Sequence, residues 1–282
     1  MIILLSVAAF LFALELWMFS YATFIEPRRF TVEEQSLQSE RVAKAADGLR
    51  IVQISDLHFA DNDWRGKLQK LVKAVNRTSP DILVFTGDLF DDFENYHGSA
   101  KDISDGLAQM NAKIVKLVVW GNHDHSRACR PVFEKTLEDG GFKVLNAESM
   151  RFSDLKLTVS GYQDGLYIQK PTDFQPIVEQ GDFHLVLCHE PDLSSWIDPD
   201  SYDLMLSGHT HGGQVNLPIL GLVYAPAMGR KYLQGWSAPG GDASRGRLYV
   251  NRGIGGAALG IRYGCRPEIS VVTLESNGLF TV

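Results

Sequence analysis

The sequence predicts an α/β fold, with helices concentrated in its first half and sheet in its second, preceded by an apolar N-terminal helix. Three observations lead to this fold class. The chain has 282 residues, 45% of them apolar, which suffices for one large domain or two small ones. Up to about residue 140, short apolar runs alternate with helix-like patterns. Beyond residue 140, short apolar runs continue but helix-like patterns are largely absent. The first 25 residues are almost entirely apolar.

The charge and the cysteines of the chain exclude some classes of protein. The formal net charge is −7, whereas nucleic-acid binders usually carry a basic face, so we expect no nucleic-acid partner. The three cysteines form no C-x-x-C pair and leave an odd count. This pattern predicts reduced thiols rather than disulfides.

The N-terminal segment is long and apolar enough to cross a membrane. Residues 2–25 carry one charge, Glu15, and such a helix rises about 1.5 Å per residue against a hydrocarbon core of about 30 Å. A cleaved signal peptide, cut near residues 20–22, is the alternative. However, no lysine or arginine precedes the apolar run, whereas Arg28 and Arg29 follow it. This bias predicts an uncleaved anchor, spanning the membrane or lying in its interface, with the following domain on the cytoplasmic side.

The chain is therefore divided into an anchor (residues 1–27), a polar segment (28–49) and a single domain (50–282). The polar segment is mixed in charge and predicts either an edge strand or a linker. No internal repeat and no further linker interrupts the domain.

Strands and helices alternate in the first half of the domain. Short apolar runs predict strands at 50–55, 82–85 and 114–119. Apolar residues at helical spacing from Leu68 to Val75, ended by Pro80, predict a helix after the first strand. Weaker patterns predict helices around 99–111 and 131–139. The second half is mostly strand, predicted at 143–146, 155–161, 183–188, 203–206, 247–251 and 268–274.

Residues of metal-binding type follow five of these strands. Binding sites in open α/β sheets form at the carboxyl ends of strands, so side chains spread over about 150 positions can converge there. The densest stretch is residues 207–213, where glycines flank two histidines one residue apart. The candidate metal ligands are Asp56, His58, Asp88, Asn122, His189, His209 and His211.

The chemistry of this set points to two metal ions. Histidine, aspartate and asparagine give mixed nitrogen and oxygen coordination, which suits Mn²⁺, Fe or Zn²⁺ rather than a thiolate site. Seven ligands exceed what one tetrahedral ion needs, and one carboxylate shared between two ions accounts for the number. We expect two divalent transition-metal ions, with Mn²⁺ favoured and Zn²⁺ or Fe as alternatives.

The motifs, in this order, resemble those of the calcineurin-like metallophosphoesterases. The resemblance covers roughly residues 50–275 and implies a layered sandwich of two mixed β-sheets flanked by helices. It also implies that the residue shared between the two ions is Asp88. The matching motifs are Asp56-x-His58, Gly87-Asp88, Gly121-Asn-His-Asp124, His189 and Gly208-His-Thr-His211.

The same resemblance assigns the ligands and a catalytic group. It implies that one ion is held by Asp56, His58, Asp88 and His211, and the other by Asp88, Asn122, His189 and His209. His123 resembles the catalytic histidine of the family, with Asp124 as a candidate orienting partner. Two divalent ions activate a water and clamp phosphoryl oxygens, and a nearby histidine can donate a proton, so this set suits hydrolysis of phosphoester bonds.

Other stretches are candidates for substrate contact. Arg252 and Arg262 belong to a glycine-rich loop and suit phosphate, although an ordinary turn is the alternative. His125 adjoins the metal motifs and is either a substrate contact or a surface-loop residue. Residues 217–226 are unusually apolar for a loop, and form either core packing or an exposed lip for an acyl chain or bilayer.

The anchor and the motifs at 208–214 and 251–256 together resemble a bacterial membrane-associated branch of the family. That branch includes a UDP-2,3-diacylglucosamine pyrophosphatase of lipid A synthesis. The resemblance implies a lipid-linked nucleotide substrate, hydrolysed at the membrane to UMP and the lipid monophosphate. A phosphodiesterase or phosphatase acting on a soluble substrate is the alternative. A non-catalytic scaffold on the same fold is disfavoured because no ligand motif is lost.

Overall fold

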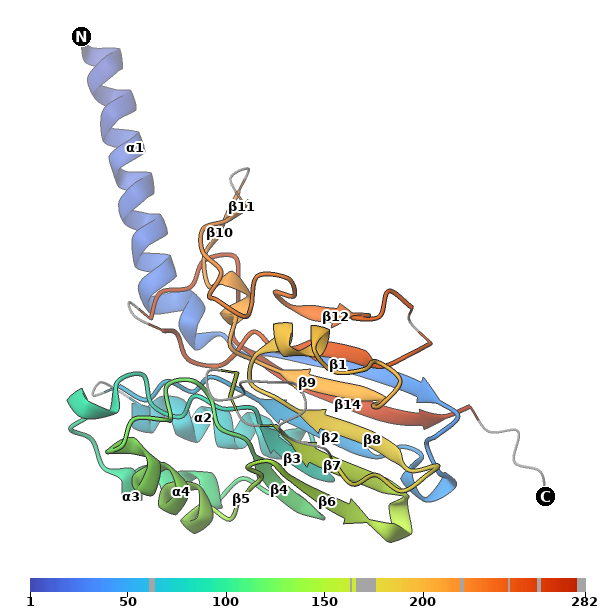
Figure 1. Ribbon diagram of the computed structural model, residues 1–282. Coiled ribbons are helices and arrows are strands. Elements are labelled where there is room, and N and C mark those ends of the chain that lie inside the picture. The colour runs from blue at the N-terminus through green and yellow to red at the C-terminus, as the bar shows by residue number, and fades with distance from the viewer. Residues whose placement is uncertain are drawn as a thin grey trace.

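Two six-stranded β-sheets lie face to face, and three helices cover the outer face of one of them (Figure 1). This arrangement confirms the layered sandwich of two mixed sheets that the resemblance implied. The computed structural model describes residues 1–60, 64–162, 164–165, 176–218, 221–242, 244–257 and 260–277.

The first sheet carries the helices. Strands β2 to β5 run parallel, while β14 lies antiparallel to β2 and pairs in parallel with the edge strand β1. In spatial order the strands are β1 (Thr31–Ser39), β14 (Glu268–Ser276), β2 (Arg50–Ile54), β3 (Ile82–Phe85), β4 (Val115–Val118) and β5 (Lys143–Val144). The helices that join β2 to β5 are α2 (Trp64–Arg77), α3 (Ala100–Ala108) and α4 (Cys129–Asp139).

The second sheet is parallel at its centre and antiparallel at both edges. In spatial order its strands are β12 (Gly235–Ser237), β13 (Arg247–Val250), β9 (Leu204–Ser207), β8 (Phe183–Leu187), β7 (Leu157–Gly161) and β6 (Glu148–Phe152). A separate two-stranded hairpin consists of β10 (Asn216–Leu217) and β11 (Gly221–Leu222).

The central strands are buried on both faces, which explains their continuous apolar sequences. Ile51, Ile82 and Val84 face the second sheet and pack between the two sheets. Val52 and Phe85 point the other way and pack against the helices. The alternation follows from the two-residue period of a strand, and it fixes the register of β2 against β3.

One polar side chain links the ends of the two sheets. Gln53 in β2 donates from Nε2 to the carbonyl oxygen of Ser207 in β9 and to Oγ1 of Thr86, each at 2.9 Å. Because both strands run on into predicted metal ligands, this buried contact helps to fix the two halves of the site relative to each other.

The predicted elements recur with ends shifted by a few residues. The polar segment, for which an edge strand or a linker was left open, contains strand β1. Among the described residues, β6, β10, β11 and β12 were not predicted, because they are short or half-exposed and lack a clear apolar pattern. The three cysteines are free and buried.

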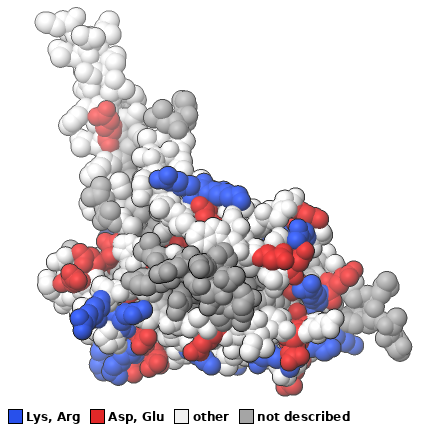
Figure 2. Space-filling model, in the orientation of Figure 1, with Lys and Arg blue, Asp and Glu red and all other residues white. Residues whose placement is uncertain are grey.

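The apolar N-terminal helix projects from the domain (Figure 1). Helix α1 (Ile2–Ser20) has no buried residue, and with the turns that follow it forms an apolar stretch, Ile2–Arg28, long enough to cross a membrane. Figure 2 shows charged side chains over the domain but almost none on this helix. Its C-terminal end is fixed to the domain, since Cys265 N donates to Glu26 Oε1 at 2.6 Å and Arg262 N donates to Ala22 O at 2.9 Å.

Candidate metal centre

The predicted metal ligands converge at one end of the sandwich. Each lies just after the carboxyl end of a strand: β2, β3 and β4 in the first sheet, and β8 and β9 in the second. Parallel strands end at the same edge of a sheet, so the two facing sheets bring residues distant in sequence together. The residues brought together are Asp56, His58, Asp88, Asn122, His189, His209 and His211.

The predicted ligand atoms form two clusters with Asp88 between them, and atoms of His58, Asp88 and His123 form a third group at the same spacing. One cluster is Asp56, His58 and His211, and the other is Asp88, His189 and His209; within each, the atoms lie within 4.8 Å of one another. Oδ2 of Asp88 is 3.4 Å from Nε2 of His58 and 3.1 Å from Nε2 of His189. One carboxylate oxygen thus reaches both clusters, which is the geometry that a bridging ligand requires.

Backbone carbonyls fix which ring nitrogen is available in the second cluster. Nδ1 of His189 lies 2.6 Å from Thr86 O, and Nε2 of His209 lies 2.7 Å from Ala227 O. A carbonyl oxygen only accepts, so the hydrogen of each neutral ring is on the nitrogen that faces it. The other nitrogens, Nε2 of His189 and Nδ1 of His209, keep their lone pairs for a ligand.

Asp91 has the same role in the first cluster. Its Oδ1 lies 3.2 Å from Nδ1 of His58, so Nε2 of that ring faces the cluster. Asp91 could not be recognised from the sequence, because an aspartate three residues after Asp88 in an acidic loop carries no distinctive signal.

The donor set fits divalent cations. Nε2 of His189, Nδ1 of His209 and Oδ2 of Asp88 are all acceptors, and Oδ1 of Asn122 lies 2.8 Å from the His209 nitrogen. Acceptors that face one another repel unless a cation lies between them. Ligand atoms about 2.0–2.2 Å from a metal are roughly 3–3.5 Å apart, and separations of 2.8–3.5 Å dominate here. The mixed nitrogen and oxygen donors suit a transition metal.

The electrostatics of the two carboxylates also favour a cation. Burial alone would raise the pKa of Asp88, yet the neighbouring His189 and His58 hold it well below its usual value. Burial likewise opposes ionisation of Asp56, but His211 and His58 lower its pKa. Both groups are therefore carboxylates in the folded chain. The positive charge beside them comes from protonated histidines, because the carboxylates, against the effect of burial, raise the pKa of His58 and His189, and these rings would lose that proton on binding an ion.

The backbone at the site is strained. Five of the seven predicted ligands have φ between 45° and 70°, a left-handed conformation uncommon for residues other than glycine. Such strain persists where the surrounding structure requires it, and it concentrates at functional sites. The five residues are Asp56, His58, Asp88, His209 and His211.

Two glycines allow the chain to approach these ligands closely. A Cβ atom on Gly121 would lie 2.2 Å from Oδ1 of Asp88, and one on Gly208 would lie 2.4 Å from Oδ2 of Asp56. Neither position can carry a side chain without moving a predicted ligand.

His123 lies beside the clusters, with its ring 4.9 Å from that of His58. The partner of its ring is the carbonyl oxygen of Asp91, which Nδ1 faces at 2.5 Å. The backbone N–H of His123 donates to Oδ1 of Asp88 at 2.9 Å. This placement leaves Nε2 for a substrate, and the catalytic role of His123 stays a prediction.

Asp124 does not contact the His123 ring, so the expectation that it orients this histidine is wrong. Its carboxylate is buried and accepts from the backbone N–H groups of Asp88, Leu89 and Gly121 at 2.8–2.9 Å. Burial and the charge of Asp88 raise the pKa of Asp124 to about 7. Asp124 therefore holds the loop that carries Asp88.

The two arginines expected to contact substrate phosphate have internal partners instead. Arg262 is fully buried and donates to the carbonyl oxygens of Gly255 and Arg252, with Nη2 3.3 Å from Nδ1 of His211. Arg252 forms ion pairs with Glu33 on β1 and Glu268 on β14. Both guanidinium groups brace the glycine-rich loop, which corrects the prediction that they bind phosphate.

His125 is neither a substrate contact nor a surface-loop residue. It is 9% exposed, its ring stacks on that of Trp120 at 5.1 Å, and its Nε2 lies 3.1 Å from Oδ2 of Asp164. Sequence position next to the metal motifs did not reveal this burial, because the covering residues come from other parts of the chain.

Comparisons with known proteins agree with this geometry. The family described as calcineurin-like phosphoesterase matches residues 49–213. An uncharacterized metallophosphoesterase of Bacillus subtilis, YkuE, is 33% identical over 92% of this chain and 90% of its own. The phosphodiesterase YaeI of Escherichia coli is 29% identical over 91% and 92%, respectively.

A further relative carries a more specific name. The UDP-2,3-diacylglucosamine pyrophosphatase LpxG of Chlamydia muridarum is 26% identical over 89% of this chain and 91% of its own. The family match and the two metal-binding clusters make this protein a metal-dependent phosphoester hydrolase. The chain belongs to the calcineurin-like phosphoesterase family.

Proposed function

We propose that this protein hydrolyses the pyrophosphate bond of UDP-2,3-diacylglucosamine at a membrane surface, giving UMP and the lipid monophosphate. The observation that carries the proposal is an apolar pocket that opens on the predicted ligands. The pocket has a volume of about 330 Å³ and is lined by Asp88, His123 and His209 on one side. Its remaining wall is mostly apolar and includes Val215, Val223, Tyr224, Pro226 and Ile261.

The exposed end of this apolar wall lies on the side of the domain from which α1 projects. The hairpin of β10 and β11 projects from the domain on the same side as α1 (Figure 1). Val223 is 61% exposed and Tyr224 is 68% exposed. In the apolar stretch 217–226, residues 219–220 lie outside the described part, and the others are exposed or half-exposed rather than core. This supports an exposed apolar lip where acyl chains pass from the bilayer to the site.

The predicted roles of the residues follow from their positions. When bound, the two ions would polarise the phosphoryl oxygens and lower the pKa of an attacking water. His123 lines the pocket, and because Nδ1 faces the carbonyl oxygen of Asp91, Nε2 is an acceptor in the neutral ring. As an imidazolium, the ring would donate a hydrogen bond or a proton from Nε2 to the phosphoryl group. Asp88 would bridge the ions, and Asp124 holds Asp88 in place. We propose Mn²⁺ as the natural metal.

The anchor and its flanking charges support a proposal about the side of the membrane on which the domain lies. Arg28 and Arg29 follow the apolar stretch and no basic residue precedes it, which favours a domain on the cytoplasmic side. Protease added outside intact cells should leave the domain uncut. Cleavage under these conditions would contradict the proposed cytoplasmic orientation but would not bear on the proposed reaction.

The substrate is tested with purified full-length protein in detergent, loaded with Mn²⁺. We expect release of UMP from UDP-2,3-diacylglucosamine and hydrolysis of bis(p-nitrophenyl) phosphate. Val223→Asp should raise KM for the lipid about tenfold or more, because a charge at the lip opposes entry of acyl chains, and should affect the aryl ester little. Ile177→Asp, at an apolar position that is 83% exposed and outside the pocket lining, is the matched control.

The second candidate is a phosphodiesterase that acts on a soluble substrate. Similarity to YaeI, which is named only as a phosphodiesterase, favours it. Hydrolysis of the aryl ester without UMP release from the lipid would select this alternative and overturn the lipid assignment.

A further inference from the structure

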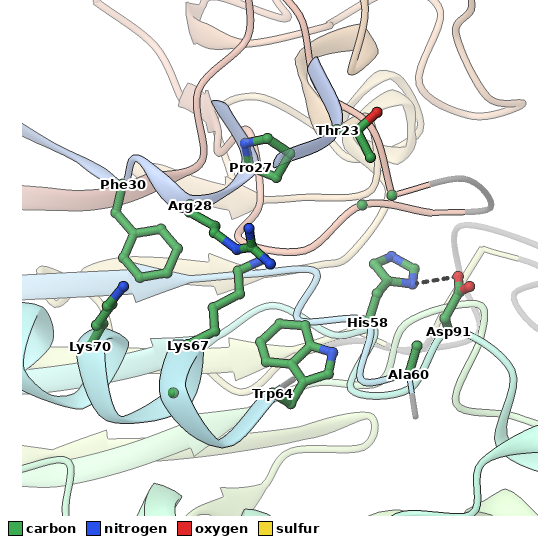
Figure 3. A pocket seen from close by; sticks show the side chains of 13 residues that line it. Thr23, Pro27, Arg28, Phe30, His58, Ala60, Trp64, Lys67, Lys70 and Asp91 are labelled. Atoms are coloured by element: carbon green, nitrogen blue, oxygen red, sulfur yellow. Dashed lines mark ion pairs between the residues drawn. The ribbon is translucent and has the colours of Figure 1, made fainter. Parts of the chain in front are cut away.

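A second cavity reaches the metal centre and differs in character from the apolar pocket. It has a volume of about 470 Å³ and lies between the end of the membrane helix and helix α2 (Figure 3). Three cationic side chains line it: Arg28, at the end of the apolar N-terminal stretch, and Lys67 and Lys70 on α2. We call it the cationic cavity.

Positive charges crowd together in this cavity. Figure 3 shows the side chains of Arg28 and Lys67 ending beside each other above Trp64. The ammonium of Lys67 donates to the carbonyl oxygen of Ile254 at 3.0 Å and lies 4.5 Å from the centre of the Trp64 ring. Among the described residues, no ion pair joins Lys67 or Lys70 to a carboxylate, and the one carboxylate in the described lining, that of Asp91, faces His58.

The pKa of Lys67 agrees with this crowding. Burial lowers it to about 7, with the charges of Arg262 and Arg28 adding to the effect. An anion bound in the cavity would attract these cations and so offset their mutual repulsion.

The cavity adjoins the metal centre through His58 and Asp91. Both residues line it, and they face each other at 3.2 Å (Figure 3). The other nitrogen of His58 is the predicted metal ligand, 3.4 Å from Asp88. A group in the cavity is therefore next to a phosphoryl group bound at the centre. The residues Thr23, Pro27 and Arg28 place the same cavity at the foot of the membrane helix.

We propose that the cationic cavity binds the second phosphate of a pyrophosphate substrate, the one that water does not attack. The inference rests on the proposed hydrolysis of a nucleotide-linked lipid. The oxygen of water bonds to the attacked phosphorus, and the bridging P–O bond breaks. Its electron pair remains on the leaving phosphate, and the protons of water pass to the site and to solvent. The leaving phosphate thus gains one negative charge, which Lys67, Lys70 and Arg28 stabilise.

This role separates the two sides of the site. The apolar pocket and its exposed lip accept an acyl chain, whereas the cationic cavity selects substrates that carry a second anionic group beside the scissile bond. A simple aryl diester has no such group, so its hydrolysis depends less on these cations.

The test compares one-phosphate and two-phosphate probes on full-length, metal-loaded protein in detergent. Bis(p-nitrophenyl) phosphate is the substrate, and UDP-glucose, a soluble pyrophosphate diester, is the competitor. The quantity measured is the ratio of the inhibition constant of UDP-glucose to KM of the aryl diester. Lys67→Gln and Lys70→Gln should each raise this ratio about tenfold, because each removes one charged contact to phosphate.

Lys73→Gln is the matched control, since Lys73 is an exposed lysine on the same helix that does not line the cavity. Its ratio should equal that of the unmodified protein. Equal ratios in all variants, or no inhibition by UDP-glucose at all, would overturn the inference. Lys70 is exposed, so its variant keeps the test valid if Lys67→Gln misfolds. Absence of UMP release from the lipid would instead count against the proposed substrate, and the ratio would still report on the cavity.

Discussion

Replacing Asp124 by asparagine tests how the metal centre is held in place. The Asp124 carboxylate accepts three backbone hydrogen bonds: Oδ2 from Asp88 and Gly121, and Oδ1 from Leu89. An asparagine side chain has one acceptor oxygen. In its best orientation the oxygen keeps the two bonds at the Oδ2 position, and the NH₂ group then faces the N–H of Leu89.

The cost of this change follows from the contacts. One charge-assisted hydrogen bond is lost and a buried donor faces another donor, which lowers the free energy of unfolding by about 2–4 kcal/mol. In a domain of this size that corresponds to a fall in Tm of roughly 5–15 °C. The Asp88 loop should loosen as well, so we expect reduced metal content and slower hydrolysis in the Asp124→Asn protein.

Thermal denaturation, metal analysis and aryl-diester kinetics on the same preparation measure these effects. Asp139→Asn is the control, because Asp139 is an exposed carboxylate in a surface ion pair with Lys135 and should change little. Unchanged Tm and full metal content with slow turnover would refute the reasoning. That result would mean that Asp124 affects turnover without holding the loop that carries Asp88.

Three further predictions concern the site and the anchor. Asp88→Asn should lose one or both ions and nearly all activity, since Oδ2 of Asp88 reaches both clusters; full metal occupancy with normal turnover would exclude bridging. His123→Ala should keep its metals and slow hydrolysis about 10²–10⁴-fold, and metal content that falls in step with activity would make His123 a ligand. A chain that lacks residues 1–20 but keeps 21–28 should be soluble without detergent and hydrolyse the aryl diester, because Glu26 bonds to the domain whereas α1 has no buried residue. Loss of metal binding in this shortened chain would show that α1 supports the domain.

The strands and the metal ligands could be predicted from the sequence because their signals are local. A buried strand needs a continuous apolar run, as at Ile82–Phe85, and a ligand that follows it needs only to be close in sequence to that run. The order of the motifs along the chain gave the resemblance to the family, and with it the assignment of the ligands to two ions. The set of ligands could therefore be predicted without knowing how the two sheets pack, although it is this packing that brings them together.

The roles of the charged residues around the ligands were decided by the tertiary structure. Arg252 has ordinary phosphate-binding features in the sequence, but β1 and β14 bring Glu33 and Glu268 to it from distant positions. Arg262 is enclosed by its own loop, and His125 meets Asp164 across the fold. A charged side chain binds the nearest opposite charge in space, which sequence spacing does not give.

The cationic cavity is a second example of a feature that the tertiary structure decides and the sequence does not reveal. Arg28 was predicted as a topology signal, and neither Lys67 nor Lys70 was selected from the sequence as a candidate binding residue. Only the packing of the segment that follows α1 against α2 brings these cations together beside His58. The sequence alone predicted the candidate metal ligands, because single residue types bind metals. The surroundings that select a substrate depend on contacts between distant segments, which only the folded chain defines.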